Sequence, residues 1–319
     1  MRVPYIFGVV SLLILGANRL VAADAAAPVQ GAAAAATHDA ASAAHDPAAP
    51  PGHHALPSAA VDLWDGIPIT NSMIVTWGVA LFLIVFAQLA TRNLKKVPDG
   101  LQNFWEWLVE SLQNFLEGII GHTLMRKTFW FFATIFIFIL FANWFGLIPG
   151  VGTIGYGVAT DHGFHIQEPL LRGANADLNM TFGMALVFFA CWIVWALQAN
   201  GAGGFVLHIF GPKGDTTGIL KVLMILVFVV VGLLEVVSIL FRPISLSFRL
   251  YGNIFAGENM LESMARLVPG WLPSIIIPIP FYFLEILVGF VQALVFMLLT
   301  AVFTLLICSH EEGHEAGHH

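Results

Sequence analysis

Arg249 lies inside strongly apolar sequence near the end of the chain, with polar residues at helical spacing around it. A cation at bilayer depth costs roughly 2.5–3.5 kcal/mol on insertion scales, so an arginine there is by default a functional group that faces a carboxylate or a water-filled path. Arg242 and Arg266 lie nearer the ends of their apolar segment, where an arginine can snorkel to the interface. We therefore expect a functional role for Arg249 and interfacial positions for the other two.

Helical spacing sorts the polar residues around Arg249 onto separate faces. Ser245, Arg249 and Asn253 recur every four residues and form one stripe. Glu258 lies nine residues after Arg249, which is about half a turn out of phase and about 13 Å along the helix axis. Glu258 is therefore expected to face away from the arginine, and Glu262 continues its face.

Further carboxylate and amide side chains interrupt the apolar sequence. Glu285 and Gln292 are seven residues apart and share a helix face, and Glu235 serves a different depth from Glu258. A carboxylic acid brought to Arg249 would lose its proton there, because a permanent cation stabilises the carboxylate, and would need a proton again on returning to lipid. The chain shows no mobile carboxylate of its own, so a partner must supply it.

Composition places the chain among helical integral membrane proteins. Of its 319 residues, 58% are hydrophobic and only 10% are charged, whereas a soluble domain has about 25% charged residues. The net charge of −7 and the lack of a long basic cluster exclude a nucleic-acid partner. Cys191 and Cys308 lie in apolar runs, so neither a disulfide framework nor a cysteine zinc site is expected. No cofactor is predicted.

The chain divides into four parts by composition. Residues 1–23 read as a secretory signal peptide, with an uncleaved anchor as the alternative, because the apolar stretch is shorter than the ~20 residues of a span. Residues 24–64 form a disordered, Ala- and His-rich extracytoplasmic tail. Residues 65–308 form the helical membrane domain, and residues 309–319 form a His- and Glu-rich cytoplasmic tail.

The sequence predicts an all-α fold of about five membrane-embedded helices plus an amphipathic helix on the membrane surface at 101–121. At 1.5 Å per residue the last two apolar segments would be about 72 and 57 Å long, against a hydrocarbon core of about 30 Å. They must tilt steeply, bend at Pro243, or lie along the membrane, and we expect a hairpin joined by Pro269-Gly270. The predicted membrane segments are 72–90, 129–148, 178–197, 218–265 and 271–308.

Basic residues orient the spans by the positive-inside rule. The loop at 91–128 is basic and therefore cytoplasmic, whereas the loop at 150–177 carries only Arg172 and lies outside. The N-terminus is then outside, in agreement with a signal peptide, and the C-terminus is cytoplasmic. The expected location is the bacterial inner membrane, crossed several times. The basic residues of the cytoplasmic loop are Arg92, Lys95, Lys96, Arg126 and Lys127.

Several motifs together resemble subunit a of the F-type ATP synthase membrane sector, over roughly residues 65–310. The most specific is Ser-Phe-Arg249-Leu-Tyr-Gly-Asn253-Ile-Phe-Ala-Gly-Glu258, followed by Glu285 and by Gln292-Ala-Leu-Val-Phe-Met-Leu-Leu-Thr. The resemblance also covers Asn143-Trp-Phe-Gly-Leu-Ile-Pro149-Gly150, Ala176-Asp177-Leu-Asn179-Met-Thr, and Glu235 before Arg242-Pro243.

This resemblance implies a non-catalytic subunit that moves ions and couples proton flow to ATP synthesis. Arg249 would face a ring of c subunits with Gln292 near it, and Glu258 and Glu285 would line the half-channel open to the outside. Asn253 and Glu235 would also lie on the ion path, and peripheral-stalk b subunits and the lipid bilayer would be the other partners. The family often has a histidine at one position matching Glu258 or Glu285, and here both are acids. The sequence leaves H⁺ and Na⁺ both open, and the transported ion is the only small molecule expected.

Three rival functions were weighed. The C-terminal tail contains two overlapping H-E-x-x-H strings, the zinc metalloprotease signature, but Gly313 and Gly317 break the helix that such a site needs. Loose metal binding or a solvated tail are the alternatives there. A secondary transporter would show internal repeats, which the sequence lacks, and a membrane anchor would not need Arg249.

Overall fold

The computed structural model describes most of the predicted membrane domain. The predicted signal peptide, the C-terminal tail, the Pro269-Gly270 connection and all but the last residues of the N-terminal tail lie outside the described residues. The described residues are 62–64, 67–148, 151, 154–160, 163–210, 219–267 and 276–308.

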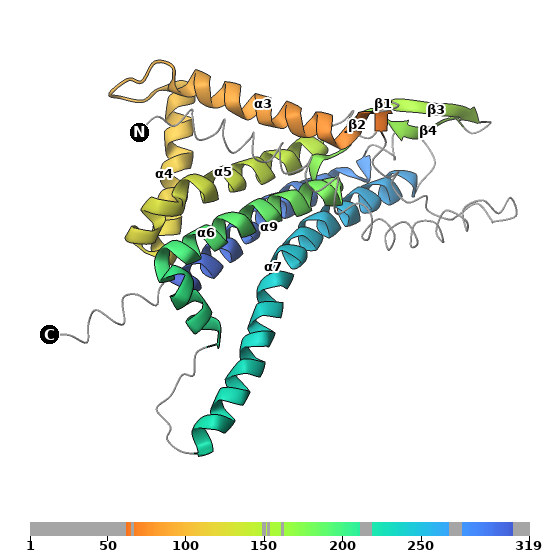
Figure 1. The fold of residues 1–319 in the computed structure, drawn as a ribbon. Coiled ribbons are helices and arrows are strands. Elements are labelled where there is room, and N and C mark those ends of the chain that lie inside the picture. The colour runs from red at the N-terminus through yellow and green to blue at the C-terminus, as the bar shows by residue number, and fades with distance from the viewer. Residues whose placement is uncertain are drawn as a thin grey trace, which may run out of the picture.

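Five of the described helices are long and apolar enough to cross a membrane, which confirms the predicted fold class. The structure also contains α4 (Gly100–Ile120), within one residue of the predicted amphipathic helix. Figure 1 shows α5, α6 and α9 packed side by side, with α3 above them and α4 crossing one end of the bundle. The five long helices are α3 (Asn71–Thr91), α5 (His122–Gly146), α6 (Leu178–Phe210), α7 (Ile219–Arg266) and α9 (Ile279–Cys308).

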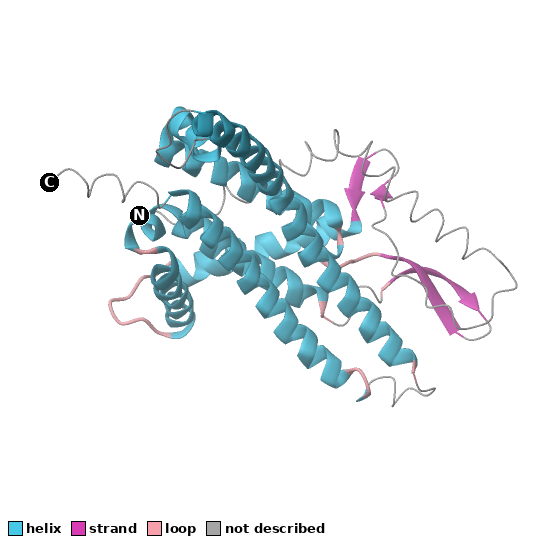
Figure 2. Ribbon diagram, turned by 90° about the horizontal axis from the view of Figure 1, so that it is seen from below, coloured by secondary structure: helices cyan, strands magenta, loops and turns pink. Residues whose placement is uncertain are grey.

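Two short antiparallel hairpins and a 3-10 turn, η1 (Ala174–Ala176), were not predicted. Residues 150–177 were expected to be a Gly-rich loop, but Gly155 pairs with Pro169 and Thr160 pairs with Gly163. Figure 2 shows the strands beyond one end of the helices. The hairpins give these connections backbone partners that a loop lacks. They are β1 (Asp62–Trp64) with β2 (Ile67–Thr70), and β3 (Gly155–Thr160) with β4 (Gly163–Pro169).

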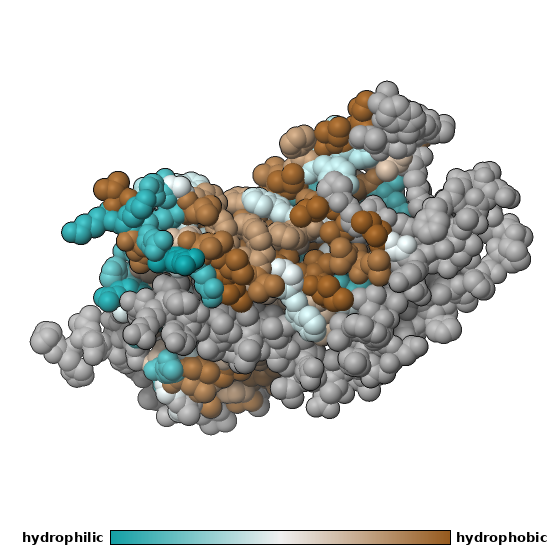
Figure 3. Space-filling view, turned by 90° about the horizontal axis from the view of Figure 1, so that it is seen from above, coloured by the Kyte–Doolittle hydropathy of each residue, from teal (hydrophilic) through white to brown (hydrophobic). Residues whose placement is uncertain are grey.

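Helix α5 forms the centre of the bundle and packs against α9, α4 and α3. Its sequence is apolar on every side, and a helix of that kind is buried all round. Phe132 and Ile139 are fully buried within it. The outer helices keep apolar surfaces instead. Figure 3 shows hydrophobic residues along the molecule and hydrophilic residues gathered at the left end, near the turn between α3 and α4.

Helix α4 places its apolar side against the bundle, as its pattern predicts. Trp105, Leu112 and Leu116 are buried, whereas Glu106 and Gln113 are exposed. Spacings of seven and four residues put the buried side chains on one face. The helix therefore lies against the bundle by one side only.

Helix α7 bends in the middle, and Figure 1 shows its first half leaving the bundle while its second half runs antiparallel to α9. Pro243 lies inside the helix. Proline has no backbone N–H and its ring clashes with the preceding turn, which is a sufficient cause of the bend. The first half exposes its apolar residues, for example Val230 at 55%. The predicted long hairpin with a bend at Pro243 is thus observed.

A polar contact ties the starts of α3 and α6 together. Ser72 Oγ donates to Asp177 Oδ2 at 2.7 Å, and the backbone N–H of Asn179 donates to Asp177 Oδ1 at 2.9 Å. Asp177 thereby caps the first turn of α6, where backbone N–H groups lack helical partners. The side chain is buried, so both contacts are shielded from water.

Asp177→Ala is expected to lower the unfolding free energy by about 1–3 kcal/mol, because it removes a helix cap and the buried hydrogen bond from Ser72 Oγ. The matched control is Asp99→Ala at the start of α4, since Asp99 makes no side-chain cap and is exposed. Denaturant unfolding of the purified protein in detergent measures both variants. Equal losses in the two variants would contradict this assignment.

Candidate functional site

The predicted stripe on α7 is exposed. Ser245, Arg249 and Asn253 all face outward, whereas Leu246 and Leu250 between them are buried. Phe248 beside the stripe is 54% exposed, so the arginine lies on an apolar surface. Within the described part of the chain, no carboxylate forms an ion pair with Arg249.

A short hydrogen bond connects this stripe to α9. Asn253 Nδ2 donates to Gln292 Oε1 at 2.6 Å. Gln292 is only 4% exposed, so its amide is held in the α7–α9 interface. The structure therefore brings Asn253 and Gln292 together and places them one helical turn from Arg249.

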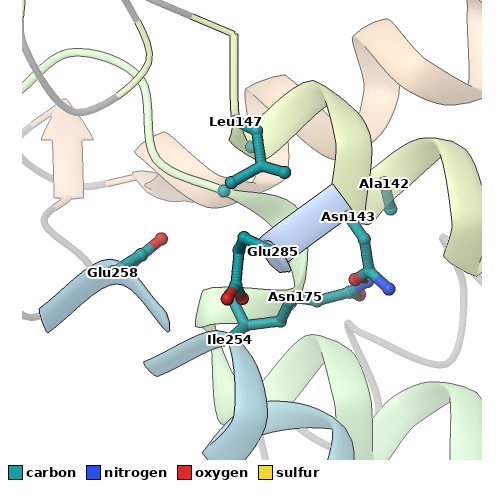
Figure 4. Close-up of a pocket in the computed structure, with 9 residues that line it drawn as sticks. Ala142, Asn143, Leu147, Asn175, Ile254, Glu258 and Glu285 are labelled. Carbon is teal, nitrogen blue, oxygen red and sulfur yellow. Dashed lines mark hydrogen bonds between the residues drawn. The ribbon is translucent and has the colours of Figure 1, made fainter. Parts of the chain in front are cut away.

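Glu258, in the second half of α7, and Glu285, near the start of α9, line one pocket. This pocket lies on a different side of α7 from Arg249. Figure 4 shows Glu258 and Glu285 coming from different helices toward the same space. The pocket has a volume of about 340 Å³ including its open mouth. It is completed by Ala142, Asn143, Gly146, Leu147, Gly173, Asn175 and Ile254.

Two glycines allow these carboxyl groups to lie against backbone. A Cβ at Gly257 would overlap the carboxyl group of Glu285, and a Cβ at Gly173 would lie 3.2 Å from Glu258 Oε1. Glu285 is 6% exposed, so its carboxyl group is enclosed between α9 and α7. The absence of side chains at positions 173 and 257 is thus a condition for the pocket.

A pair of amides forms the opposite wall. Asn175 Nδ2 donates to Asn143 Oδ1 at 2.6 Å, and Asn143 Nδ2 donates to Gly289 O at 2.9 Å. Among the described residues, none donates to the buried Oδ1 atom of Asn175. This acceptor is closed off from solvent, so it stays without a hydrogen bond from the described part of the chain.

Asn143 and Asn175 were not among the predicted site residues, although Asn143 lies within, and Asn175 directly before, a motif that carries the family resemblance. The available signal for Asn143 was an amide inside the apolar segment that became α5. Asn175 lies in η1, outside any predicted helix, and its place in the pocket depends on how the loop folds back. The spacing of residues along one helix cannot predict such a contact between a loop and a helix.

Arg172 is a third residue whose position was not anticipated. The positive-inside argument used it only as a loop charge, yet it is 6% exposed. The charges that act on the Glu258 carboxyl group are those of Arg172, Glu285 and Glu262. A buried guanidinium thus supplies positive charge near a site that otherwise contains acids.

Glu235 is not part of this pocket. It lies in the first half of α7, is exposed, and its Oε1 atom is 3.3 Å from Arg242 Nη2. The predicted site residues therefore fall into three places along α7. These are the Glu235 region, the Arg249 stripe with Gln292, and the pocket of Glu258 and Glu285.

The described residues contain no group of three or more His, Cys, Asp or Glu side chains that could hold a metal ion. The H-E-x-x-H strings lie in the C-terminal tail, outside the described residues. The pocket offers two carboxyl groups and two amides, which are groups that can bind water and exchange protons.

Comparison with known proteins gives one consistent family. A family model described as ATP synthase A chain matches residues 73–304. The chain is 34% identical over 245 residues to ATP synthase subunit a of Gloeobacter violaceus, covering 76% of this chain and 86% of that protein. It is 31% identical over 241 residues to the sodium ion specific ATP synthase subunit a of Propionigenium modestum, covering 75% of this chain and 74% of that protein.

Gly257→Ala is expected to increase the reaction of Glu285 with a water-soluble carbodiimide, because the new methyl group must displace that carboxyl group from its enclosed position. Gly78→Ala is the matched control, since nothing lies within 4 Å of a Cβ there. Mass spectrometry of the labelled protein measures the extent of modification. Unchanged labelling of Glu285 in the Gly257 variant would show that the carboxyl group lies elsewhere.

Proposed function

Because the chain belongs to the ATP synthase A chain family, we propose that Arg249 separates two offset half-channels through which protons reach a rotating ring of c subunits. The coarser function follows from the family: the chain is a non-catalytic, ion-translocating membrane subunit of ATP synthase. The proposal adds residues and roles to it. Its main support is that the exposed Arg249 and the pocket residue Glu258 lie on different faces of α7, while Glu285 of α9 lines the same pocket as Glu258.

Arg249 is the proposed barrier and exchange site. It stays protonated under all relevant conditions, so it neither accepts nor relays a proton. Its exposed position on an apolar face, without a carboxylate partner among the described residues, suits a partner that brings one. A carboxylic acid of the c ring that reaches Arg249 releases its proton there, since the nearby cation stabilises the carboxylate. Asn253 and Gln292 would stand beside that exchange.

Glu258 and Glu285 are the proposed relay of the half-channel that opens outside. Both line the same pocket, together with the amide residues Asn143 and Asn175. Two carboxyl groups that face one space can pass a proton through water between them. Glu235, in the other half of α7, is proposed for the cytoplasmic side.

The proposed topology and partners follow the charges of the sequence. We propose a bacterial inner-membrane location with the N-terminus outside and the C-terminus in the cytoplasm, because the loop before α4 carries Arg92, Lys95 and Lys96. The c ring would contact the Arg249 face. Peripheral-stalk b subunits are the other proposed protein partner. The four-part division of the chain, with a signal peptide at 1–23, remains part of this proposal.

Arg249→Ala is expected to abolish coupled ATP synthesis and ATP-driven pumping while the complex still assembles, because the barrier between the two paths loses its charge. Pumping is measured by quenching of a pH-sensitive dye in inverted vesicles, and assembly by the subunit content of the purified complex. Arg92→Ala, an exposed cation at the end of α3, is the control and should pump normally. Normal pumping by the Arg249 variant would refute the role assigned to it.

Glu258→Gln and Glu285→Gln are each expected to slow pumping by about tenfold. The pumping rate does not fall to zero, because in each variant the other carboxyl group remains in the pocket and can still carry protons. The double variant should lose more than either single one. The measurement is the initial pumping rate at equal amounts of complex. Wild-type rates in both single variants would remove the two residues from the path.

The ion is proposed to be a proton, since the proposed relay groups Glu235, Glu258 and Glu285 are carboxyl groups, which bind and release protons, while the amides orient water. Na⁺ is the alternative ion, because the relative from Propionigenium modestum is described as sodium ion specific. Pumping that continues without added Na⁺ is the expected result. A pumping rate that rises with Na⁺ from near zero would establish the alternative.

A further inference from the structure

Arg242, for which an interfacial position was expected, packs its guanidinium group against two aromatic rings. Its guanidinium carbon is 5.4 Å from the centre of the Trp192 ring and 4.6 Å from the centre of the Phe303 ring. The arginine side chain is only 17% exposed. A guanidinium over aromatic faces gains attraction from both rings, so Arg242 is held within the protein instead of snorkelling to water. The side chain of Arg266 lies outside the described residues.

The two aromatic rings are themselves fixed by α6 and α9. Trp192 is 1% exposed, and its Nε1 donates to the backbone O of Phe303 at 3.1 Å. Two turns further along α6, Asn200 Nδ2 donates to the backbone O of Ile307 at 2.8 Å. These bonds join the two helices where the guanidinium is held. The cradle of Arg242, defined as Trp192 and Phe303, is therefore a preorganised part of the bundle.

The anchored guanidinium holds Glu235. Arg242 Nη2 donates to Glu235 Oε1 at 3.3 Å, and the Glu235 side chain is 48% exposed. An exposed ion pair is ordinarily weak because two flexible side chains must be ordered. Here the arginine is already ordered by the rings, so only the carboxylate side chain remains to be fixed. The pair spans the two helical turns directly before Pro243, where α7 bends.

We propose that Arg242 is a positioning residue for the cytoplasmic-side path: its aromatic cradle fixes the guanidinium, which holds the Glu235 carboxylate at the outer surface of α7. This inference rests on the proposed function, because it takes Glu235 to be a group on the ion path. It adds a residue that touches no ion and acts only through Glu235. It also gives Trp192 and Phe303 a role that packing alone does not require.

Arg242→Gln is expected to slow ATP-driven pumping by about fivefold in the assembled complex, because Glu235 loses the partner that orients it. Arg242→Lys should recover part of the rate, since an ammonium group can also pair with Glu235 and lie against the rings. In the Glu235→Gln background, Arg242→Gln should cause no further slowing. A merely structural role predicts the same slowing in both backgrounds, and that result would overturn the inference.

Phe303→Leu tests the cradle without removing the charge. It should slow pumping by about twofold to threefold, and again only when Glu235 is present. The control is Phe82→Leu on α3, a partly exposed aromatic that contacts Phe86, Phe141 and Phe145 and has no cation over its ring. If the Arg242→Gln complex fails to assemble, the Phe303 cycle decides the matter. Equal slowing by Phe303→Leu with and without Glu235 would then overturn the proposal.

Different results would contradict the proposed role of Arg249 and the inference about Arg242. Normal pumping after Arg249→Ala removes the proposed function, whatever happens at position 242. Loss of pumping after Arg249→Ala, together with wild-type pumping after Arg242→Gln, removes only the inference about Arg242. The subunit content of each purified complex shows in every case that the rates compare assembled proteins.

Discussion

The cost of a permanent charge on an apolar helix face is the constraint on which the structure depends. Arg249 cannot be neutralised by losing its proton, and the described residues offer it no ion pair. In lipid an uncompensated cation costs roughly 2.5–3.5 kcal/mol on insertion scales, and under the proposed function a partner subunit offsets that cost. The neighbouring Phe248 is more than half exposed, so the same face is also apolar. A partner that is itself a membrane helix carrying a carboxylate satisfies both properties.

The polar residues of helix α7 lie at different positions along its axis and on different faces of the helix. From Glu235 to Glu258 the helix rises about 35 Å, close to the thickness of a bilayer core. Arg249 lies between them, on an exposed face, while Glu258 faces a pocket closed by Gly257, Gly173 and the start of α9. Under the proposed function, a proton that moved from the pocket to the Glu235 region would have to pass the cation between them.

Periodicity predicted the features that belong to single helices. The exposed stripe at Ser245, Arg249 and Asn253 was predicted from a spacing of four residues. The shared face of Glu285 and Gln292 was predicted from their spacing of seven residues. The bend at Pro243 followed from a missing backbone donor. What spacing could not predict were contacts made between elements. Asn175 enters the pocket from η1, and Arg172 is buried by a loop that folds back onto α7. The strands at 155–169 depend on pairing across a Gly-rich segment, for which composition indicated only a loop.

Arg242 and Arg249 are the same type of residue on the same helix, but their surroundings differ. Arg242 and Arg249 are seven residues apart and lie on the same helix, yet one is enclosed by aromatic rings and the other is exposed. The difference comes from α6 and α9, which approach α7 near Pro243 with Trp192 and Phe303. The ring faces and Glu235 compensate the charge of Arg242 within the chain. The charge of Arg249 has no such compensation from the described residues, so under the proposed function Arg242 positions Glu235 while Arg249 meets the partner's carboxylate.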